Sequence, residues 1–271
     1  RRFSRPASRT PTRTRTSDET MVDTKRFEGK VVVITGSSRG IGKATALSFA
    51  KEGASVVLAA RGADALAAVK SEIESLGAKA HTVVTDVSSE ADNKKMVEEA
   101  KAAFGGEIHA AFLCAGAITM GAIVDTAEEQ VDHIVGVNIK SVIFGLKYLV
   151  PAMKAGGSII VCSSTMGSTG RASCAGLGLY SASKSMVDML VKYAAVEAAP
   201  TVRINGISPG VFSTDMTTAM NPDELTKSTN LIPRPGNPDE IGHLVKYLAS
   251  DESAYVTGSN MVIDAGWALK A

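Results

Sequence analysis

The stretch VVVITGSSRGIG, residues 31–42, decides the fold class of this chain. It opens with an unbroken β-branched run, which is the pattern of a strand buried on both faces of a parallel sheet. The run ends in a glycine-rich turn, and the turn leads directly into an amphipathic stretch at 41–52. A strand, a glycine turn and a helix in this order predict the first half of a βαβ unit.

The same alternation continues to the end of the chain. Apolar runs predict further strands at 55–60, 80–84, 108–113, 158–162, 202–208 and 260–264. Helical patterns follow them at 63–76, 89–104, 128–154, 180–198 and near 238–250. We therefore predict an α/β fold: a single-domain, Rossmann-like, doubly wound sheet of about seven mostly parallel strands with helices on both faces.

The first residues of the chain differ in composition from the rest. Residues 1–20 contain six arginines, two acids and almost no large apolar side chains. Such a segment cannot offset its ordering entropy by burial, so we predict a disordered basic extension over 1–27 and one domain over 28–271. The extension is either an addition upstream of a start at Met21 or an organelle-targeting segment.

Composition excludes several classes of partner. The net charge is +1 and the basic excess sits in the N-terminal extension, so we expect no nucleic-acid binding. The apolar stretch 110–124 is too short to span a bilayer, and we predict no membrane segment. The three cysteines are odd in number and lack metal-ligand spacing, so we predict no metal site and reduced thiols in the cytoplasm.

The glycine turn predicts a dinucleotide site. Gly36, Gly40 and Gly42 permit unusual dihedral angles and let the backbone approach a pyrophosphate at a helix N-terminus. The next predicted strand ends in Ala60 and Arg61, without the acid that would bind a ribose 2′-hydroxyl and repel a 2′-phosphate. Arg61 and Arg39 favour NADP(H), although Arg61 could instead cap a solvated loop.

Two side chains in YSASK, residues 180–184, suggest the chemistry. Tyr180 and Lys184 are four apart on a predicted helix and therefore share one face, where an ammonium stabilises a neighbouring phenolate. The preceding strand ends in Ser163-Ser164, at the sheet edge where ligands of open α/β folds bind. Asn138 lies on the long helix before that strand.

These motifs resemble those of the short-chain dehydrogenase/reductase family from about residue 28 to residue 267. The likeness implies that Ser164, or failing it Ser163, binds the substrate oxygen and that Tyr180 is the general acid and base. It further implies that Lys184 holds the nicotinamide ribose and that Asn138 anchors a water in the proton relay. The predicted cofactor contacts, from the glycine turn, Arg61 and this resemblance together, are Gly36, Ser38, Arg39, Gly40, Ile41, Gly42, Arg61, Asp86, Val87, Cys114, Ala115, Gly116, Tyr180, Lys184, Pro209, Gly210, Val211 and Thr214.

The chain departs from the family pattern in two places. Leu113 and Cys114 stand where two asparagines are usual, and the loop 167–179 lengthens the spacing between Ser164 and Tyr180. The longer loop either reshapes the substrate wall or is a surface insertion. Residues 215–235 are either a substrate lid with apolar contacts from Met216, Met220 and Leu231 or a plain surface excursion.

The sequence thus predicts an NADP(H)-dependent oxidoreductase that interconverts a small-molecule carbonyl and a secondary alcohol. An NAD-dependent alcohol or polyol dehydrogenase is the first alternative. A non-catalytic, dinucleotide-binding regulatory protein is the second, but it would have no need of the Tyr180–Lys184 pair. The family resemblance also implies a homotetramer or homodimer, with 254–267 as the candidate interface segment.

Overall fold

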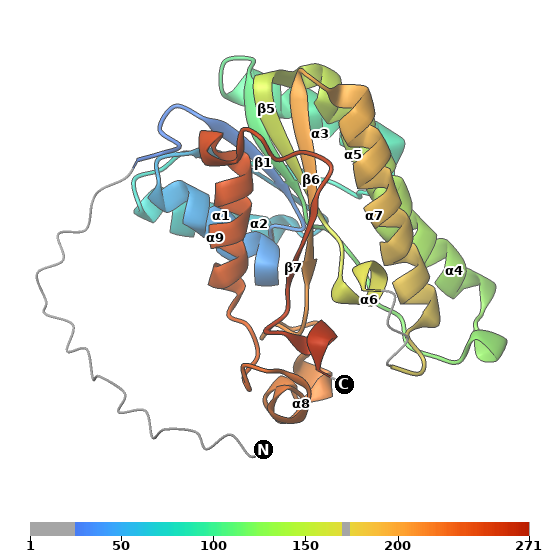
Figure 1. Cartoon of the computed structure of the whole chain (residues 1–271). Coiled ribbons are helices and arrows are strands. Elements are labelled where there is room, and N and C mark those ends of the chain that lie inside the picture. The colour runs from blue at the N-terminus through green and yellow to red at the C-terminus, as the bar shows by residue number, and fades with distance from the viewer. Residues whose placement is uncertain (1–24, 170–173, 271) are drawn as a thin grey trace, which may run out of the picture.

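The computed structural model describes residues 25–169 and 174–270. Within these ranges seven strands form one sheet in the order β3-β2-β1-β4-β5-β6-β7, and every pair is parallel (Figure 1). This confirms the predicted doubly wound α/β fold. The strands are β1 (Val31–Thr35), β2 (Ser55–Ala60), β3 (Ala80–Val84), β4 (Ile108–Leu113), β5 (Met153–Cys162), β6 (Val202–Pro209) and β7 (Asn260–Ile263).

Helices cover both faces of the sheet (Figure 1). Successive residues of β1 point to opposite faces, so Val31 and Val33 join one core while Val32 and Ile34 join the other. The first core packs against α3 (Glu90–Ala103), α5 (Ser141–Leu149) and α7 (Gly178–Ala198). The second core packs against α1 (Gly40–Lys51), α2 (Ala63–Ser75) and α9 (Pro238–Ala249).

The helix expected over 128–154 is divided into several parts. It comprises α4 (Glu128–Ile134), a π-helical segment at Val135–Lys140, α5 and a 3-10 turn at Val150–Ala152. The helical region expected near 128–154 is present as a continuous run, Glu128–Ala152, and its π-helical segment carries Asn138, whose side chain bonds to the backbone of Ala117. Strand β5 also begins earlier than expected, at Met153.

The span Glu128–Ala152 is long and apolar enough to cross a membrane by length and composition, and an 18-residue window within it has a mean hydropathy of 1.4. It is nevertheless part of a protein layer, since Ile134 and Leu149 are fully buried and α5 packs against α3 and β4. Buried helices of folded proteins have the same composition, so the packing of this span against neighbouring elements accounts for its apolar character.

The folded body begins before the predicted boundary at residue 28. Phe27 is 3% exposed, and its ring meets that of Phe49 edge to face at 4.8 Å. Arg26 forms an ion pair with Glu52 at 2.7 Å. The assignment of residues 25–27 to the extension was therefore wrong, because burial of one aromatic ring secures this short segment. The rest of the predicted disordered extension, residues 1–24, lies outside the described residues.

Several short helices gather at the carboxyl end of the strands, where β7 and α8 lie close together (Figure 1). Residues 215–235, the candidate lid, are largely helical. The short elements there are η1 (Ile123–Asp125), α6 (Thr165–Ser168), η4 (Thr218–Met220), α8 (Pro222–Thr229) and η6 (Trp267–Leu269). A further short element, η5 (Asp251–Ser253), lies at the other end of the sheet, where the Ser253 hydroxyl accepts from Arg203 near the start of β6.

Candidate active site at the carboxyl edge of the sheet

The turn between β1 and α1 requires glycine at two positions. Gly36 has a φ of +68°, and a Cβ there would lie 2.9 Å from the Cα of Ala115. A Cβ on Gly42 would lie 2.3 Å from the carbonyl oxygen of Gly36. The first turn of α1 carries no acidic side chain, so its N–H groups and its dipole favour an anion. This cradle fits a pyrophosphate.

A cavity of about 830 Å³ opens at this turn. Every residue predicted to contact the cofactor lines it, as do Ser164 and Ser163. Apart from Tyr180 and Lys184 on α7, these residues lie at or after the carboxyl ends of the six strands β1 to β6, and β1 and β4 flank the point where the strand order reverses. Open α/β folds bind their ligands at such a point.

Two arginines stand at the wall of this cavity. Arg61 follows β2, and Arg39 is the N-cap residue of α1. Arg39 Nη1 lies 3.9 Å from a carboxylate oxygen of Asp215, at the start of the candidate lid. Asp86 follows β3, and hydrogen bonds from the hydroxyl and the N–H of Ser88 lower the pKa of its carboxyl group.

The predicted catalytic pair lies on α7. Lys184 is 4% exposed, and its Nζ donates to the carbonyl oxygen of Cys162 at 2.9 Å. The same Nζ lies 5.9 Å from the centre of the Tyr180 ring. A Cβ on Gly116 would come within 3.4 Å of Nζ, so glycine leaves room for the ammonium.

Ser164 ends the loop after β5 and caps α6. Its Oγ accepts from the N–H of Met166 at 3.2 Å. That bond uses an oxygen lone pair, so the hydroxyl keeps its proton for donation. Ser163 is engaged differently, because its Oγ donates to the carbonyl oxygen of Lys184 at 3.1 Å. The geometry therefore favours Ser164 over Ser163 as the residue that meets a substrate oxygen.

Asn138 is placed behind the cavity wall rather than in it. Its side chain is 1% exposed and bonds to both backbone groups of Ala117, at 2.8 and 2.9 Å. Its Nδ2 also donates to the Ser183 hydroxyl at 3.0 Å. Among the described residues that line the cavity, Ala117 is present and Asn138 is not. Asn138 thus couples α7 to the loop after β4.

Sequence reasoning missed most of the apolar wall near Ser164 and Tyr180. It named Met216 and Met220, which do line the cavity, and Leu231, which does not and is 59% exposed. Their position depends on how loops fold back, and no local pattern signals it. Two residues of the loop 167–179, Cys174 and Leu177, also line the cavity, while residues 170–173 lie outside the described residues. Sequence reasoning placed Cys174 and Leu177 in a possible substrate wall and Leu225, Ser228 and Thr229 in the candidate lid without naming the last four individually. It gave no sign of Met166, Trp267 and Lys270.

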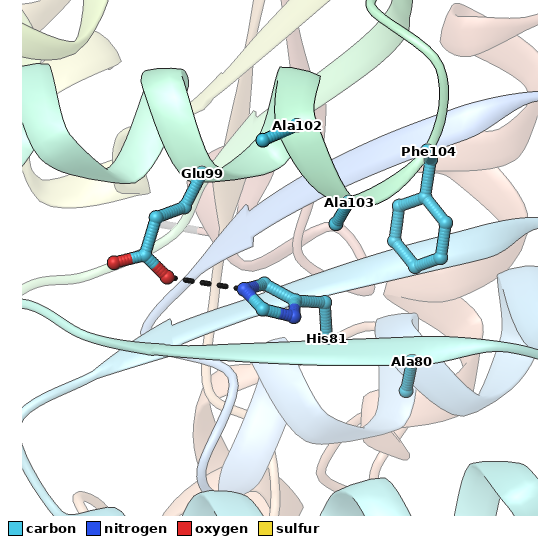
Figure 2. Close-up of a pocket in the computed structure, with 6 residues that line it drawn as sticks. All are labelled: Ala80, His81, Glu99, Ala102, Ala103 and Phe104. Atoms are coloured by element: carbon cyan, nitrogen blue, oxygen red, sulfur yellow. Dashed lines mark hydrogen bonds and ion pairs between the residues drawn. The ribbon is translucent and has the colours of Figure 1, made fainter.

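A second hollow, of about 370 Å³, lies between β3 and the end of α3. Figure 2 shows an imidazole–carboxylate pair there, in which His81 Nε2 lies 3.0 Å from Glu99 Oε2. His81 is at the start of its strand, and Phe104 follows the last turn of α3. The hollow is therefore at the amino edge of the sheet, away from the predicted site residues.

Comparison with known proteins agrees with the geometry. A family model described as enoyl-(acyl carrier protein) reductase matches residues 36–268. The chain is 36% identical over 251 residues to cyclohexanol dehydrogenase of Acinetobacter sp. The matched region covers 90% of this chain and 97% of that protein. The chain belongs to the short-chain dehydrogenase/reductase family. It is an oxidoreductase of alcohol and carbonyl groups, and the family binds a nicotinamide dinucleotide.

Solved members of the short-chain dehydrogenase/reductase family share the whole fold. The enzyme from Serratia marcescens is 32% identical with a TM-score of 0.85, over 90% of this chain and 99% of that one. A short-chain dehydrogenase from Burkholderia cenocepacia, solved in complex with NADP, is 28% identical with a TM-score of 0.84, over 89% and 99%.

Leu113 and Cys114, which stand where the family pattern has two asparagines, lie at a strand end whose backbone is held by a side chain of the neighbouring strand. The hydroxyl oxygen of Thr35, at the end of β1, accepts from the N–H groups of Cys114 and Ala115 at 3.0 and 3.2 Å. The end of β4 is therefore tied to β1 by a side chain from the neighbouring strand. The Cys114 and Cys162 thiols hydrogen-bond each other, which raises the pKa of Cys114 and lowers that of Cys162.

Proposed function

We propose that this protein is an NADP(H)-dependent oxidoreductase that interconverts a small-molecule carbonyl and a secondary alcohol, with Tyr180 as general acid and base. One observation carries the proposal. Tyr180, Lys184 and Ser164 line the same cavity as the glycine turn at the start of α1. Phenol, ammonium and hydroxyl groups therefore face the space that a dinucleotide bound at this turn would enter.

Each side chain has a part in the proposed reaction. When bound, the nicotinamide supplies or accepts the hydride. The Ser164 hydroxyl donates a hydrogen bond to the substrate oxygen, and Tyr180 gives that oxygen a proton in reduction or removes one in oxidation. Lys184 is fixed by the Cys162 carbonyl, and its Nζ lies 5.9 Å from the centre of the Tyr180 ring. Proton transfer by a positioned group is worth roughly 10²–10⁴-fold in rate.

Asn138 supports this constellation from behind. We propose that Asn138 anchors a water of the proton relay. The hydrogen bonds of its amide set the positions of the neighbouring Ala117 and Ser183.

Replacement of Tyr180 by phenylalanine tests the catalytic proposal. We expect Tyr180→Phe to keep NADPH affinity, measured by fluorescence titration, and to lose about 10²-fold or more in turnover. Tyr193→Phe is the matched control, since Tyr193 lies on the same helix and is 65% exposed. Retained turnover in Tyr180→Phe would remove Tyr180 as the acid and favour the non-catalytic, dinucleotide-binding alternative.

The preference for the 2′-phosphate rests on Arg61 and Arg39. Both line the cavity, and no acid follows Ala60 at the tip of β2. A guanidinium offers several donors to a phosphate, whereas an acid at this tip would repel it. The NADP complex of the Burkholderia cenocepacia relative supports the same cofactor for this chain.

A charge reversal at Arg61 tests the cofactor preference. We expect Arg61→Asp to weaken NADPH binding about tenfold to a hundredfold, because charge-assisted hydrogen bonds are lost and repulsion is gained. NADH binding should improve or stay level. Lys101→Asp makes the same change of charge at an exposed position of α3 and should leave the affinity for NADPH and for NADH unchanged. An unchanged NADPH to NADH ratio in Arg61→Asp would favour the NAD-dependent alcohol or polyol dehydrogenase.

We also assign the protein to the cytoplasm as a homotetramer or homodimer whose partner molecules are its small substrates. The three cysteines are unpaired, as expected of a reducing compartment. Cell fractionation tests the location, and finding the protein in an oxidising compartment would overturn it. Residues 28–271 are proposed as a single catalytic domain.

A further inference from the structure

The reactive part of the cavity has an apolar wall assembled from separate segments. Met166 lies two residues after Ser164, and its N–H bonds to the Ser164 hydroxyl. Leu177 lies three residues before Tyr180, and its carbonyl oxygen accepts from the N–H of Ser181. Both residues line the cavity together with Ser164 and Tyr180. Further apolar side chains come from the segment between β6 and α9 and from the C-terminal turn: Met216, Met220, Leu225 and Trp267.

Polar groups of this wall already have partners within the protein. The hydroxyls of Ser228 and Thr229 donate to the carbonyl oxygen of Leu225, at 3.2 and 2.8 Å. The ammonium of Lys270 donates to the carbonyl oxygen of Asn230 at 3.2 Å. A carboxylate oxygen of Asp215 lies 3.9 Å from Arg39 Nη1, beside the glycine turn. Of the described residues that line the cavity, none from the lid or the C-terminal turn adds a further carboxylate or carboxamide.

This arrangement of apolar side chains and already bonded polar groups favours an apolar substrate over a polyol. A polyol placed here would lose its hydrogen bonds to water and find few replacements, at a cost of about 1–3 kcal/mol for each unsatisfied group. An apolar body would instead gain by leaving water. The unbranched, polarizable methionine side chains adapt to irregular shapes, which favours a bulky ring over one fixed outline.

Resting on the proposed function, we propose that the substrates are alicyclic or similarly bulky ketones, and the matching secondary alcohols, whose bodies are apolar. Met166 and Leu177 contact the substrate next to its carbonyl group. Met216, Met220 and Leu225 cover its far side. In reduction, the carbonyl carbon gains the hydride and the oxygen gains the Tyr180 proton, so the ketone is reduced as NADPH is oxidised.

A matched pair of ketones tests the substrate class. 4-tert-Butylcyclohexanone and 4-hydroxycyclohexanone share the ring and the carbonyl group and differ in the polarity of the far end. With NADPH we expect kcat/KM for the butyl ketone to exceed that for the hydroxy ketone by about tenfold or more. Equal or reversed values, or better turnover of a ketose such as dihydroxyacetone, would overturn the substrate class.

The same measurements test the proposed function separately from the substrate class. Turnover of the hydroxy ketone or the ketose that still depends on Tyr180 would leave the proposed function intact while removing the apolar substrate class. Wild-type protein that binds NADPH but reduces none of the three compounds would overturn the substrate class and count against the proposed activity. NADPH affinity, measured without any ketone, separates these cases.

A substitution in the wall tests the same inference from the protein side. We expect Leu225→Asn to lower kcat/KM for the butyl ketone about tenfold, to change the value for the hydroxy ketone less, and to leave NADPH affinity unchanged. Leu231→Asn is the control, because Leu231 is exposed and does not line the cavity. Thermal melting verifies that both variants are folded. Equal losses for the two ketones would show that Leu225 does not meet the far end of the substrate.

Discussion

At the scale of single residues, Thr35 illustrates how one side chain ties together the ends of two neighbouring strands. Its hydroxyl is buried at the end of β1 and serves the N–H groups of both Cys114 and Ala115. A buried N–H without an acceptor costs about 1–3 kcal/mol. The residues that hold the cofactor wall in place are thus not confined to the glycine turn.

Thr35→Val is expected to lower the melting temperature by several degrees and to weaken cofactor binding. Valine keeps the shape of threonine but removes the acceptor, so two backbone donors lose their partner. Differential scanning fluorimetry with and without NADPH measures both effects. Thr201→Val, at an exposed position, should change neither quantity. A melting temperature equal to wild type in Thr35→Val would mean that other groups satisfy these donors.

At the scale of elements, the candidate lid is anchored where it joins α9. Arg234 makes two hydrogen bonds to the Glu240 carboxylate, at 2.9 and 2.7 Å, and the N–H of Asn237 bonds to the same carboxylate. These bonds lower the pKa of Glu240 to about 2. The anchor belongs to the capping box of α9, so the stability of the helix start and the position of the lid end are linked.

The pH dependence of this anchor follows from the sign of the shift. Because the pKa of Glu240 is lower in the folded protein than its ordinary value of 4.5, the ion pair stabilises the fold above about pH 4.5. That contribution is lost as the pH falls from 4.5 toward 2. We expect Glu240→Gln to lower the melting temperature by about 1–3 °C at pH 7, a small effect because the pair is exposed. The difference should shrink below pH 4.5, and a constant difference down to pH 2.5 would contradict the assignment.

At the scale of the whole molecule, β7 leaves one edge of the sheet open. It is the last strand in the sheet order, and Val262 on β7 and Tyr255 before it are exposed. Unpaired strand edges with apolar side chains favour association. The candidate interface segment 254–267 contains both residues, which supports the proposed oligomer.

The Tyr255→Lys, Val262→Lys double variant is expected to lower the molar mass measured by light scattering. Lysine at both positions places like charges against a second copy of the same edge, which opposes pairing. Val124→Lys is the control, because Val124 is exposed on η1, away from this edge. An unchanged mass in the double variant would exclude segment 254–267 as the interface.

The sequence predicted the sheet more accurately than the long connections. The bounds of β1, β2 and β4 agree with the expected ranges, because strands buried on both faces are nearly continuous apolar runs. The bounds of β3 agree as well, although this edge strand is only partly buried. The early start of β5 was missed, since residues 153–157 include two glycines and three exposed positions. The π-helical segment around Asn138 was missed because its cause, a bond to Ala117, is distant in sequence.

The amino-acid sequence alone was enough to predict the fold, the glycine turn and the order of the candidate catalytic side chains, because each depends on short-range patterns at strand ends. The tertiary structure decided which loops meet over those side chains. Met166, Leu177 and Leu225 come from three separate segments, and no local signal announces that they share one wall. Such a wall forms only when the sheet holds those segments at one edge, so substrate selection depends on the assembled molecule.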